Sequence, residues 1–412
     1  MITIAEALEK VSGLTGPIGT EHVSLPQLIR RRLAEPLLAD VDSPPHDKSL
    51  MDGYAVRSAD VVRLPVELKL LETVTAGEVP QQAVKPGTAT RVMTGAPIPI
   101  GADCVVMVEN TSPIAGPEDV QTAVLIERGE YSTHQHLLKR GRSMRAGELI
   151  FDRGHLLRPH DLGLLAEIGQ THVLVYRRPG VAVISTGNEL VAPELRPGPG
   201  CIRNSNGPLL ASLARSSARE VLELGVARDD LGELCAKIRA AESAELVVLS
   251  GGVSEGLADL VPRALGECGF KEVFHKVSIK PGKPIWFGIS ERDGRRRWAF
   301  GLPGNPVSSL VCFEIFVRVA IERLSGNSLT QRTTHWAKLG EPHSVRGPRP
   351  TWWPANLIHD PLGAAVVHPL QWHGSSDLRC LGAADCLAFF PSRNEPYGAG
   401  ELVRVLPLLT GR

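Results

Sequence analysis

Three segments between residues 250 and 309 carry residue types that hold anions. In the first, SGGVSEG, an apolar run precedes the glycines and a helical pattern follows them. Gly251, Gly252 and Gly256 therefore lie where backbone amides converge on a helix N-terminus, and the missing side chains let an anion approach. Each segment alone is ordinary in structural turns and caps, but their clustering indicates a phosphate-rich ligand.

The second segment, KVSIKPGKP, is predicted to be a strand. Lys276 and Lys280 are separated by an even number of residues, so on a strand both ammonium groups face one side, and Lys283 follows a Pro-Gly turn. In the third segment, GLPGNPVSS, Asn305 is placed to cap a helix that begins at Pro306. The free amides of that helix are expected to face the preceding loop.

Composition excludes several classes of partner. Lys+Arg and Asp+Glu both number 45, so the chain has no global positive field to hold a nucleic acid. The seven cysteines include no C-x-x-C pair, which favours reduced thiols. No basic and apolar leader is seen, and no apolar run approaches the ~20 residues of a membrane span. We therefore expect a cytoplasmic protein with neither a membrane nor a nucleic acid as partner.

The order of apolar patterns predicts a multidomain α/β protein. Its centre is an α/β layer domain with a mostly parallel sheet, accompanied by a small β-rich inserted domain and a C-terminal β domain. An Arg-rich amphipathic helix is expected near residues 25–38, and another helix starts near Pro159. The expected domains are a linking, partly helical domain at 1–43 and 146–178, the β-rich domain at 44–145, the α/β domain at 179–326 and the C-terminal domain at 327–412.

Polar residues follow the predicted strands of the α/β domain. Thr186, Asn188 and Glu189 come after one strand, Asp229 ends a second segment, and Asp259 lies in the first turn after the glycine segment. Ligands of open α/β sheets bind where strands end. Because Mg²⁺ takes one or two carboxylates together with phosphate oxygens, these acids are candidate metal ligands. Acids in first turns also offset the helix dipole, so the capping interpretation stays open.

Six segments over about residues 45 to 325 resemble, in order, the signature segments of the molybdopterin molybdenumtransferases, which are bacterial enzymes related to the C-terminal part of gephyrin. The segments are HDKSLMDGYAV (46–56), RVMTGAPIPIGADCVV (91–106), ISTGNEL (184–190), SGGVSEGLAD (250–259), KVSIKPGKP (276–284) and GLPGNPVSS (301–309).

The resemblance implies the last step of molybdenum cofactor synthesis. Adenylated molybdopterin and molybdate are the substrates, Mg²⁺ is the cofactor, and AMP is released. The implied residues are catalytic Asp52, Thr94, Glu189, Lys276 and Lys280; ligand-binding Thr186, Gly251, Gly252, Ser254, Pro303, Gly304, Asn305, Pro306 and Ser375; and metal-binding Asp229 and Asp259. Arg349 is a further candidate for ligand contact.

The resemblance also implies a homodimer. Asp52 and Thr94 lie on the small β-rich domain, which in the family faces the α/β domain of the other subunit, so the site is shared between subunits. The pterin substrate and the oxyanion are the small-molecule partners. The adenylyltransferase that acts one step earlier is a candidate protein partner.

Two positions depart from the family pattern. Where the family has Gly-Glu-Asp, this chain reads Gly141, Arg142 and Ser143, and Asn188 replaces an aspartate. Serine cannot bind a cation as a carboxylate does. This leaves open a catalytically weak molybdopterin-binding or scaffold protein. A second alternative is the preceding adenylyltransferase, which resembles the α/β part alone, and the flanking β domains argue against it.

Overall fold

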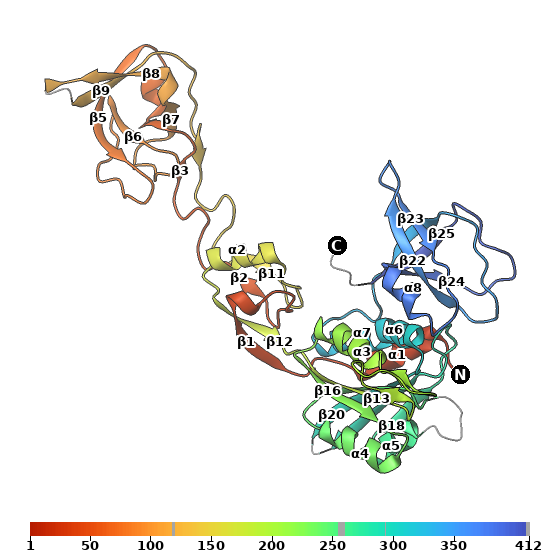
Figure 1. Ribbon diagram of the computed structural model, residues 1–412. Helices are drawn as coiled ribbons and strands as arrows, with labels where there is room; N and C mark the ends of the chain where they lie inside the picture. Colours follow the sequence, from red (N-terminus) through yellow and green to blue (C-terminus); the bar gives the residue numbers. More distant parts are fainter. Residues whose placement is uncertain (118–119, 254–259, 293, 409–412) are drawn as a thin grey trace. The chain divides into compact units, whose positions relative to one another are not determined.

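The computed structural model describes residues 1–117, 120–253, 260–292 and 294–408 of the 412-residue chain. They form two compact units: unit 1 combines Met1–Val23 with Leu174–Arg412, and unit 2 is Ser24–Val173 (Figure 1). The chain leaves unit 1 through β1 (Thr20–Ser24) and returns through β12 (His172–Tyr176), and these two strands pair. Unit 2 is therefore an insertion into unit 1.

Unit 2 is β-rich, as predicted, and is built on a six-stranded sheet of order β7-β4-β6-β5-β9-β8. Neighbouring residues of β4 enter different cores: Tyr54 packs with Val106 on one face, and Ala55 packs with Val105 on the other. A slip of one residue would exchange these faces, so burial fixes the register. The elements are β4 (Gly53–Val56), η2 (Ser58–Val61), β5 (Val66–Val74), β6 (Thr88–Val92), β7 (Cys104–Met107), η3 (Val108–Asn110), β8 (Thr111–Ala115) and β9 (Gln121–Ile126).

The Arg-rich helix predicted for residues 25–38 is wrong. A short 3₁₀ turn, η1 (Leu25–Gln27), is followed by a turn with Arg30 at φ 60°. Long-range bonds then replace helical ones, because the Leu33 amide donates to the His155 carbonyl at 3.0 Å. The rest of this region consists of β2 (Leu37–Leu38) paired with β11 (Leu149–Phe151), β3 (Lys48–Ser49) paired with β10 (Leu137–Leu138), and α2 (Pro159–Glu167).

Unit 1 contains the predicted α/β layer, a six-stranded sheet of order β16-β13-β17-β20-β19-β18. Four neighbouring strands, β16, β13, β17 and β20, run parallel, and β19 and β18 continue the sheet in antiparallel fashion. The mostly parallel sheet is thus confirmed. Its strands are β13 (Gly180–Thr186), β16 (Glu220–Ala227), β17 (Leu246–Ser250), β18 (Lys271–His275), β19 (Trp286–Arg292) and β20 (Arg295–Leu302), with the short pair β14 (Leu190–Val191) and β15 (Ile202–Arg203) beside it.

Helices cover both faces of this sheet (Figure 1). On β13, Val181 and Val183 pack on one face and Ala182 and Ile184 on the other, because side chains alternate along a strand. The first face is covered by α1, α3 and the helix after β20, and the second by α4 and α5. The helices are α1 (Ile4–Leu14), α3 (Asn206–Arg215), α4 (Leu231–Ala240), α5 (Val261–Glu267), α6 (Pro306–Cys312) and α7 (Arg318–Leu324), with a π-helical turn (Phe313–Val317) joining α6 to α7.

The C-terminal β domain predicted after the α/β domain is a closed five-stranded barrel. Trp352, Leu387 and Leu406 of the barrel belong to the same hydrophobic core as α6 and α7, so the barrel packs on the α/β layer. The barrel consists of β21 (His335–Leu339), β22 (Thr351–His359), β23 (Ala365–Pro369), β24 (Cys386–Phe390) and β25 (Leu402–Pro407), with α8 (Leu378–Ala383).

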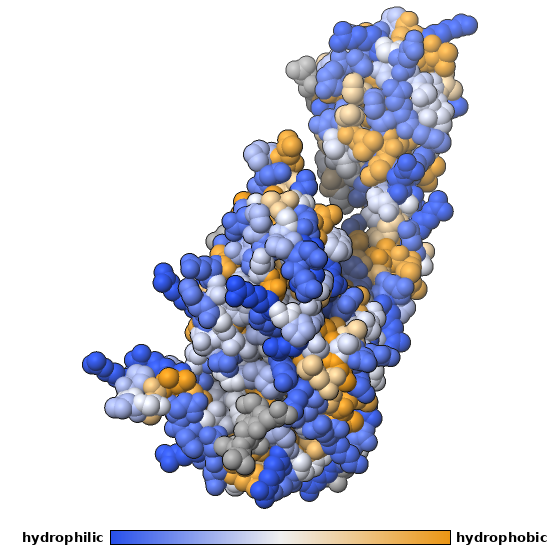
Figure 2. All heavy atoms as spheres, turned by 90° about the vertical axis from the view of Figure 1, so that its right-hand side faces the viewer, coloured by the Kyte–Doolittle hydropathy of each residue, from blue (hydrophilic) through white to orange (hydrophobic). Residues whose placement is uncertain are grey.

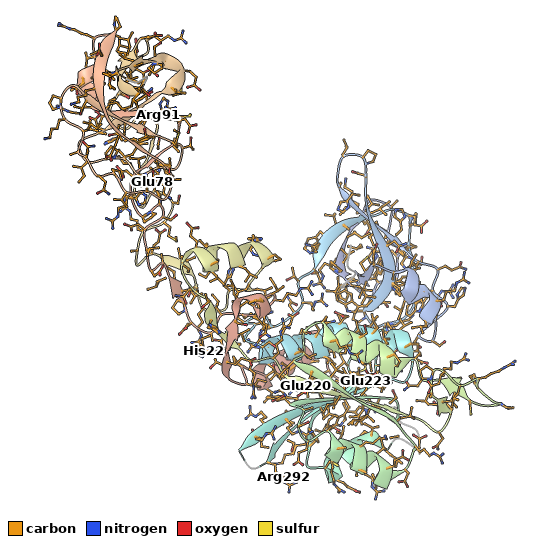
Figure 3. The ribbon with its side chains drawn as sticks, turned by 60° about the vertical axis from the view of Figure 1, so that its left-hand side comes forward. His22, Glu78, Arg91, Glu220, Glu223 and Arg292 are labelled. Atoms are coloured by element: carbon orange, nitrogen blue, oxygen red, sulfur yellow. The ribbon has the colours of Figure 1, made fainter. Side chains whose placement is uncertain are left out.

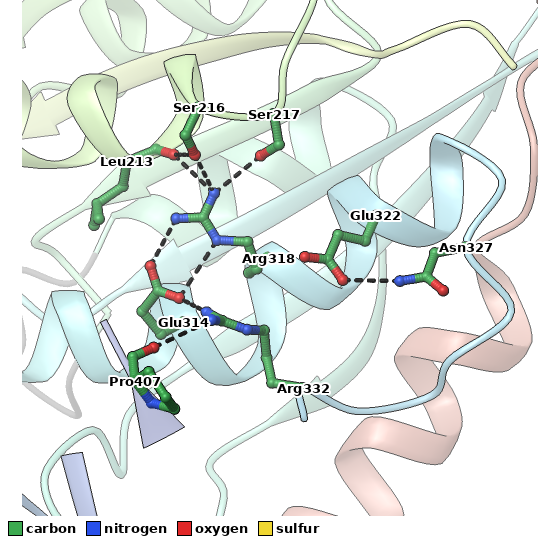
Figure 4. A network of polar contacts seen from close by, with 9 residues as sticks. All are labelled: Leu213, Ser216, Ser217, Glu314, Arg318, Glu322, Asn327, Arg332 and Pro407. Carbon is green, nitrogen blue, oxygen red and sulfur yellow. Dashed lines mark hydrogen bonds and ion pairs between the residues drawn. The ribbon is translucent and has the colours of Figure 1, made fainter. Parts of the chain in front are cut away.

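A buried ionic network joins this barrel to the helices (Figure 4). Glu314, in the π-helical turn, has a fully buried side chain and accepts from Arg318 Nη2 at 2.7 Å. It also pairs with Arg332, whose Nη2 donates to the carbonyl of Pro407 at 3.2 Å. Burial lowers the pKa of Arg318, and that of Arg332, to about 10. One carboxylate therefore supports two cations, the buried Arg318 of α7 and the largely buried Arg332 of the segment before β21.

The surface is mixed in character. On the face shown in Figure 2, hydrophobic side chains lie in several separate groups between hydrophilic ones. Charged side chains such as Glu220 and Glu223 on β16 and Arg292 at the end of β19 are labelled in Figure 3. None of the helices in the described part of the chain combines the length and the apolar character needed to cross a bilayer.

Replacing Glu314 by alanine is expected to lower the free energy of unfolding of unit 1 by about 3–5 kcal/mol, because two buried guanidinium groups lose their shared carboxylate. All six tryptophans lie in unit 1, so urea unfolding followed by tryptophan fluorescence reports on this unit. Glu223→Ala is the matched control, since the exposed pair of Glu223 with Arg215 is worth less than about 1 kcal/mol. Equal losses for the two variants would contradict this role of Glu314.

Candidate functional site

The four parallel strands of unit 1 end side by side. The register pairs Thr186 of β13 with Ala227 of β16, Ser185 of β13 with Ser250 of β17, and Ser250 with Leu302 of β20. Parallel strands carry their carboxyl ends at one edge, so the loops that follow these residues meet there. We call this the strand-end edge. It brings together the predicted residues around 186, 229, 251 and 303.

Asp229 is fixed at this edge by the loop after β13. The Thr186 hydroxyl donates to Asp229 Oδ1 at 3.1 Å, and the Asn188 amide donates to Oδ2 at 3.4 Å. The Asn188 side-chain oxygen in turn accepts from the Asp229 amide at 3.1 Å. Asn188 therefore performs a structural task for which its amide oxygen suffices. Asp230, by contrast, caps α4 through the Glu233 amide at 2.8 Å.

Gly251 and Gly252 form the turn after β17, as predicted. Both have positive φ, 101° and 61°. A Cβ on Gly251 would lie 2.4 Å from the Thr186 carbonyl oxygen, and a Cβ on Gly304 would lie 3.6 Å from Gly251 Cα. The two predicted ligand loops thus approach each other closely at the strand-end edge. Only glycine permits this approach at Gly251.

A buried polar group that sequence reasoning missed ties these loops together. Asn206 Nδ2 donates to Ser250 Oγ at 2.7 Å and to the Gly304 carbonyl at 2.6 Å. Ser309 Oγ donates to the Pro303 carbonyl at 2.5 Å. Among the described residues, the buried Oδ1 of Asn206 has no hydrogen-bond partner. The polar run Asn204–Gly207 at the start of α3 was the available signal in the sequence.

At the start of α6, after Pro303, part of the backbone amides already donate hydrogen bonds within the protein. Gly304 and Asn305 are exposed, and within the described part of the chain Asn305 makes no side-chain cap bond, contrary to the predicted cap. The amide of Val307 donates to the Ser375 carbonyl at 3.0 Å. This bond uses an amide that the prediction left free, and Pro306, the predicted first helical residue, has no amide hydrogen. The same bond places Ser375 next to this helix start.

The lysine strand predicted for KVSIKPGKP is wrong. β18 ends at His275, Lys276 has φ 73°, and the following residues up to Ile285 form a loop. The loop is tied down because Ile2 donates to the Lys276 carbonyl at 3.2 Å, and Lys280 forms a bridge to Thr351 of the barrel. Strand alternation therefore does not bring the two ammonium groups to one face.

Specific contacts of this loop decide where its side chains can act. Lys280 Nζ donates to the Arg346 carbonyl at 3.1 Å. Arg349, a candidate for ligand contact, donates through Nη1 to the Ile279 carbonyl at 2.8 Å and so holds the loop.

Glu189 is exposed, and its carboxylate lies close to Gly187, where a Cβ would be 2.5 Å from Oε2.

Asp52 and Thr94 form a pair within unit 2. Asp52 Oδ1 accepts from the Thr94 amide at 2.7 Å and from the Thr94 hydroxyl at 2.8 Å. The backbone bond first, and the hydroxyl second, hold the pKa of the Asp52 carboxyl below its usual range, with a smaller effect of Arg91. Arg91 lies on β6 (Figure 3). Asp52 is therefore an exposed, ionised carboxylate in a fixed position.

Of the two predicted metal ligands, Asp229 and Asp259, the structure describes Asp229. Ser254, Gly256 and Asp259 lie outside the described residues. In the remainder of the chain, no group of three or more His, Cys, Asp or Glu residues could hold a metal ion. Asp229 is thus the described carboxylate that bears on the prediction.

Comparisons with known proteins define the class. Three family models match in succession: the MoeA N-terminal region (domain I and II) over residues 2–169, a probable molybdopterin binding domain over 182–323, and the MoeA C-terminal region (domain IV) over 337–408. The chain is 31% identical over 410 residues to a molybdopterin molybdenumtransferase of Staphylococcus aureus, covering 98% of this chain and 95% of the relative. It is 31% identical over 421 residues to that of Bacillus subtilis, covering 98% and 94%.

Solved structures agree. A molybdopterin biosynthesis MoeA protein from Pyrococcus horikoshii has TM-score 0.83 and 32% identity and covers 100% of both chains. A second structure of such a protein from this organism has TM-score 0.77 and 27% identity, covering 99% of this chain and 100% of that one. Fold and comparisons together define an enzyme of molybdenum cofactor biosynthesis. The chain belongs to the molybdopterin molybdenumtransferase family.

Gly251→Ala is expected to destabilise unit 1 by about 2 kcal/mol or more, because the new Cβ would press on a backbone carbonyl at a positive φ. Gly266→Ala is the control: it lies in α5 with nothing within 4 Å of its Cβ position, and helical alanine changes stability by about 1 kcal/mol or less, in the stabilising direction. Urea unfolding measures both. A Gly251→Ala protein as stable as the parent would show that the two loops do not approach as described.

Proposed function

We propose that this chain inserts molybdenum from molybdate into adenylated molybdopterin, with Mg²⁺-dependent release of AMP. The observation that carries the proposal is the strand-end edge, where a fixed carboxylate, Asp229, lies on the same sheet edge as the Gly251–Gly252 turn and the Pro303–Gly304 loop. Phosphate groups are bound by glycine turns at helix starts, and carboxylates beside them hold the divalent cation. Adenylated molybdopterin carries such phosphate groups, and Mg²⁺ is the divalent cation that would bind beside them.

Asp229 fits the needs of Mg²⁺. Its two oxygens accept one hydrogen bond each, from Thr186 and Asn188, so lone pairs remain on both. Mg²⁺ commonly takes one or two protein carboxylates and completes its shell with substrate phosphate oxygens and water. When bound, the cation would neutralise charge on the phosphoanhydride. Asp229 would hold it, and Thr186 keeps Asp229 oriented.

The remaining residues bind and orient the substrates. Substrate phosphate oxygens would lie against the Gly251–Gly252 turn, which is fixed by its close packing on Thr186, and Asn206 keeps the Gly304 loop beside it. Lys276 and Lys280 supply positive charge for molybdate or the pterin phosphate from a loop tied to the barrel. Glu189, exposed at the end of β13, positions a water molecule or the ligand. Placement and charge compensation are thus the protein's contribution.

We further propose a homodimer in which Asp52 and Thr94 of one subunit complete the strand-end edge of the other. Support comes from the fixed and ionised state of Asp52, which suits a polar contact to a ligand. The preceding adenylyltransferase is a proposed partner, because it would supply the adenylated substrate. All seven cysteines, each among the described residues, are unpaired, which favours a reducing cytoplasm.

The purified chain is expected to release AMP from adenylated molybdopterin only when molybdate and Mg²⁺ are both present. Asp229→Asn should raise the Mg²⁺ concentration needed for half-maximal release by about tenfold or more, because it removes a carboxylate ligand. Asp230→Asn is the matched control, since asparagine caps helices as well as aspartate does. Substrate binding without AMP release would instead favour a molybdopterin-binding protein, the alternative that Ser143 suggested.

The shared site predicts complementation between inactive variants. Asp52→Asn and Asp229→Asn are each expected to lower AMP release, while co-expressed subunits should recover about a quarter of parental activity, because half of the dimers are mixed and each mixed dimer keeps one intact site. Two differently tagged copies allow the mixed dimer to be purified and assayed. Recovery no greater than the sum of the two variants would contradict a site completed in trans.

A further inference from the structure

Unit 2 contains a basic hollow that the proposed function leaves unused. It has a volume of about 650 Å³ and is lined by residues 137–145 together with Leu50 and Glu148. We call it the 137–148 hollow. Pockets of this size accommodate small-molecule ligands such as a nucleotide.

The backbone of the lining loop is held in place within unit 2. The Arg140 amide donates to Asp47 at 2.8 Å, and the Ala146 amide donates to Asp42 at 2.9 Å. An anion in the hollow would therefore be bound by side chains and not by these amides. The amides of residues 141 and 142 donate to the carbonyls of Pro44 and Lys139, and those of residues 143 and 144 both donate to the Ser43 carbonyl. The amide of residue 145 donates to the Glu148 carboxylate.

Two of the four cations on this loop are already paired. Lys139 contacts Asp47 at 2.7 Å, and Arg140 contacts Asp42 at 2.5 Å. The Ala146 amide and Arg140 are the main causes that lower the pKa of Asp42. These two pairs are satisfied without any ligand.

Arg142 and Arg145 differ from Lys139 and Arg140. Over the described ranges of the chain, their guanidinium groups make no hydrogen bond or ion pair, and both residues are exposed at the hollow. Counting Asp42, Asp47 and Glu148 against the four cations leaves one net positive charge. Guanidinium groups bind phosphate in a bidentate manner, and the exposed hydroxyl of Ser143 lies between them in sequence as a further donor.

The hollow also has an apolar side. Leu50 is 46% exposed, while Leu137 and Met144 are buried beneath the lining. An inorganic anion would leave Leu50 in water, whereas a flat ring carried on the anion would cover it. The chemistry of the lining therefore fits an organic phosphate.

The hollow is connected to the Asp52–Thr94 pair. Ser49 of β3 pairs with Leu137 of β10 at the hollow. Its carbonyl also accepts from the Gly95 amide at 2.8 Å, and its amide donates to the Ala96 carbonyl at 2.9 Å, so β3 also holds the loop that carries Thr94. A ligand in the hollow would thus lie beside the part of unit 2 that the proposed function uses.

We propose that the 137–148 hollow binds a nucleoside monophosphate unit, with its phosphate on Arg142 and Arg145 and its base against Leu50. The anion site consists of residues of unit 2 alone. The choice of a nucleotide rests on the proposed function, in which AMP is the product.

Photolabelling of the full chain with 8-azido-AMP tests this directly, because the azide reports where the base lies. The expected result is a labelled peptide that contains Leu50, with labelling suppressed by AMP at least about tenfold more efficiently than by inorganic phosphate or by adenosine. Label found only in unit 1, or suppression by phosphate or adenosine as efficient as that by AMP, would overturn the proposal.

Variants locate the phosphate. Arg142→Gln combined with Arg145→Gln should weaken suppression by AMP about tenfold or more, whereas Arg63→Gln, an exposed arginine elsewhere in unit 2, should not. Ser143→Asp gives a second variant that removes no cation and should weaken AMP binding by repulsion. Unchanged AMP binding in both hollow variants would overturn the proposal. The readout needs no turnover, so a chain that fails to release AMP but labels at Leu50 contradicts the proposed function and not this site.

Discussion

The candidate site depends on the parallel pairing of β16, β13, β17 and β20. Parallel strands end at one edge, and the register places Thr186, Ser250 and Leu302 in neighbouring rows there. Asp229, the glycine turn and the Pro303–Gly304 loop become neighbours because of this pairing and not because of their spacing in sequence. β19 runs in the opposite direction and its loop leaves that edge, whereas β18 runs in the direction of β20 again, so that His275 at its end lies near the edge through its pairing with Trp286.

Two further arrangements make the edge a fixed structure. Buried polar groups, chiefly Asn206, hold the loops to α3, and the Glu314 network holds the barrel to the helices. The barrel in turn ties the loop that carries Lys280. Each connection joins segments far apart in the chain, so the position of each ligand-binding loop is a property of unit 1 as a whole.

Sequence patterns predicted the layers of the fold well because periodicity reports burial directly. The α/β layer, its mostly parallel sheet, the β-rich insertion and the C-terminal β domain all appear in the structure. The predictions that are wrong involve long-range backbone bonds. Leu33 bonds to His155 where a helix was predicted, and the Lys276 and Lys280 segments bond to Ile2 and the barrel where a strand was predicted. Local propensity contains no information about such partners.

The candidate site also contains some features that the sequence predicted and others that it could not predict. The turn at Gly251 and Gly252 was predictable because a buried-strand pattern precedes the glycines and a helical pattern follows them, and both glycines have positive φ in the structure. Asn206 was missed, because a buried amide that bridges two loops has no periodic signal. Asn188, a departure from the family pattern, is explained by its bond to the Asp229 amide, which needs an oxygen acceptor and no charge.

A crystal structure of the chain with adenylated molybdopterin and Mg²⁺ tests the central claim most directly. The account predicts phosphate density against the Gly251–Gly252 turn and the neighbouring Gly304 loop, with the cation on Asp229. Phosphates bound away from the strand-end edge, with Asp229 still bonded only to Thr186 and Asn188, would contradict it.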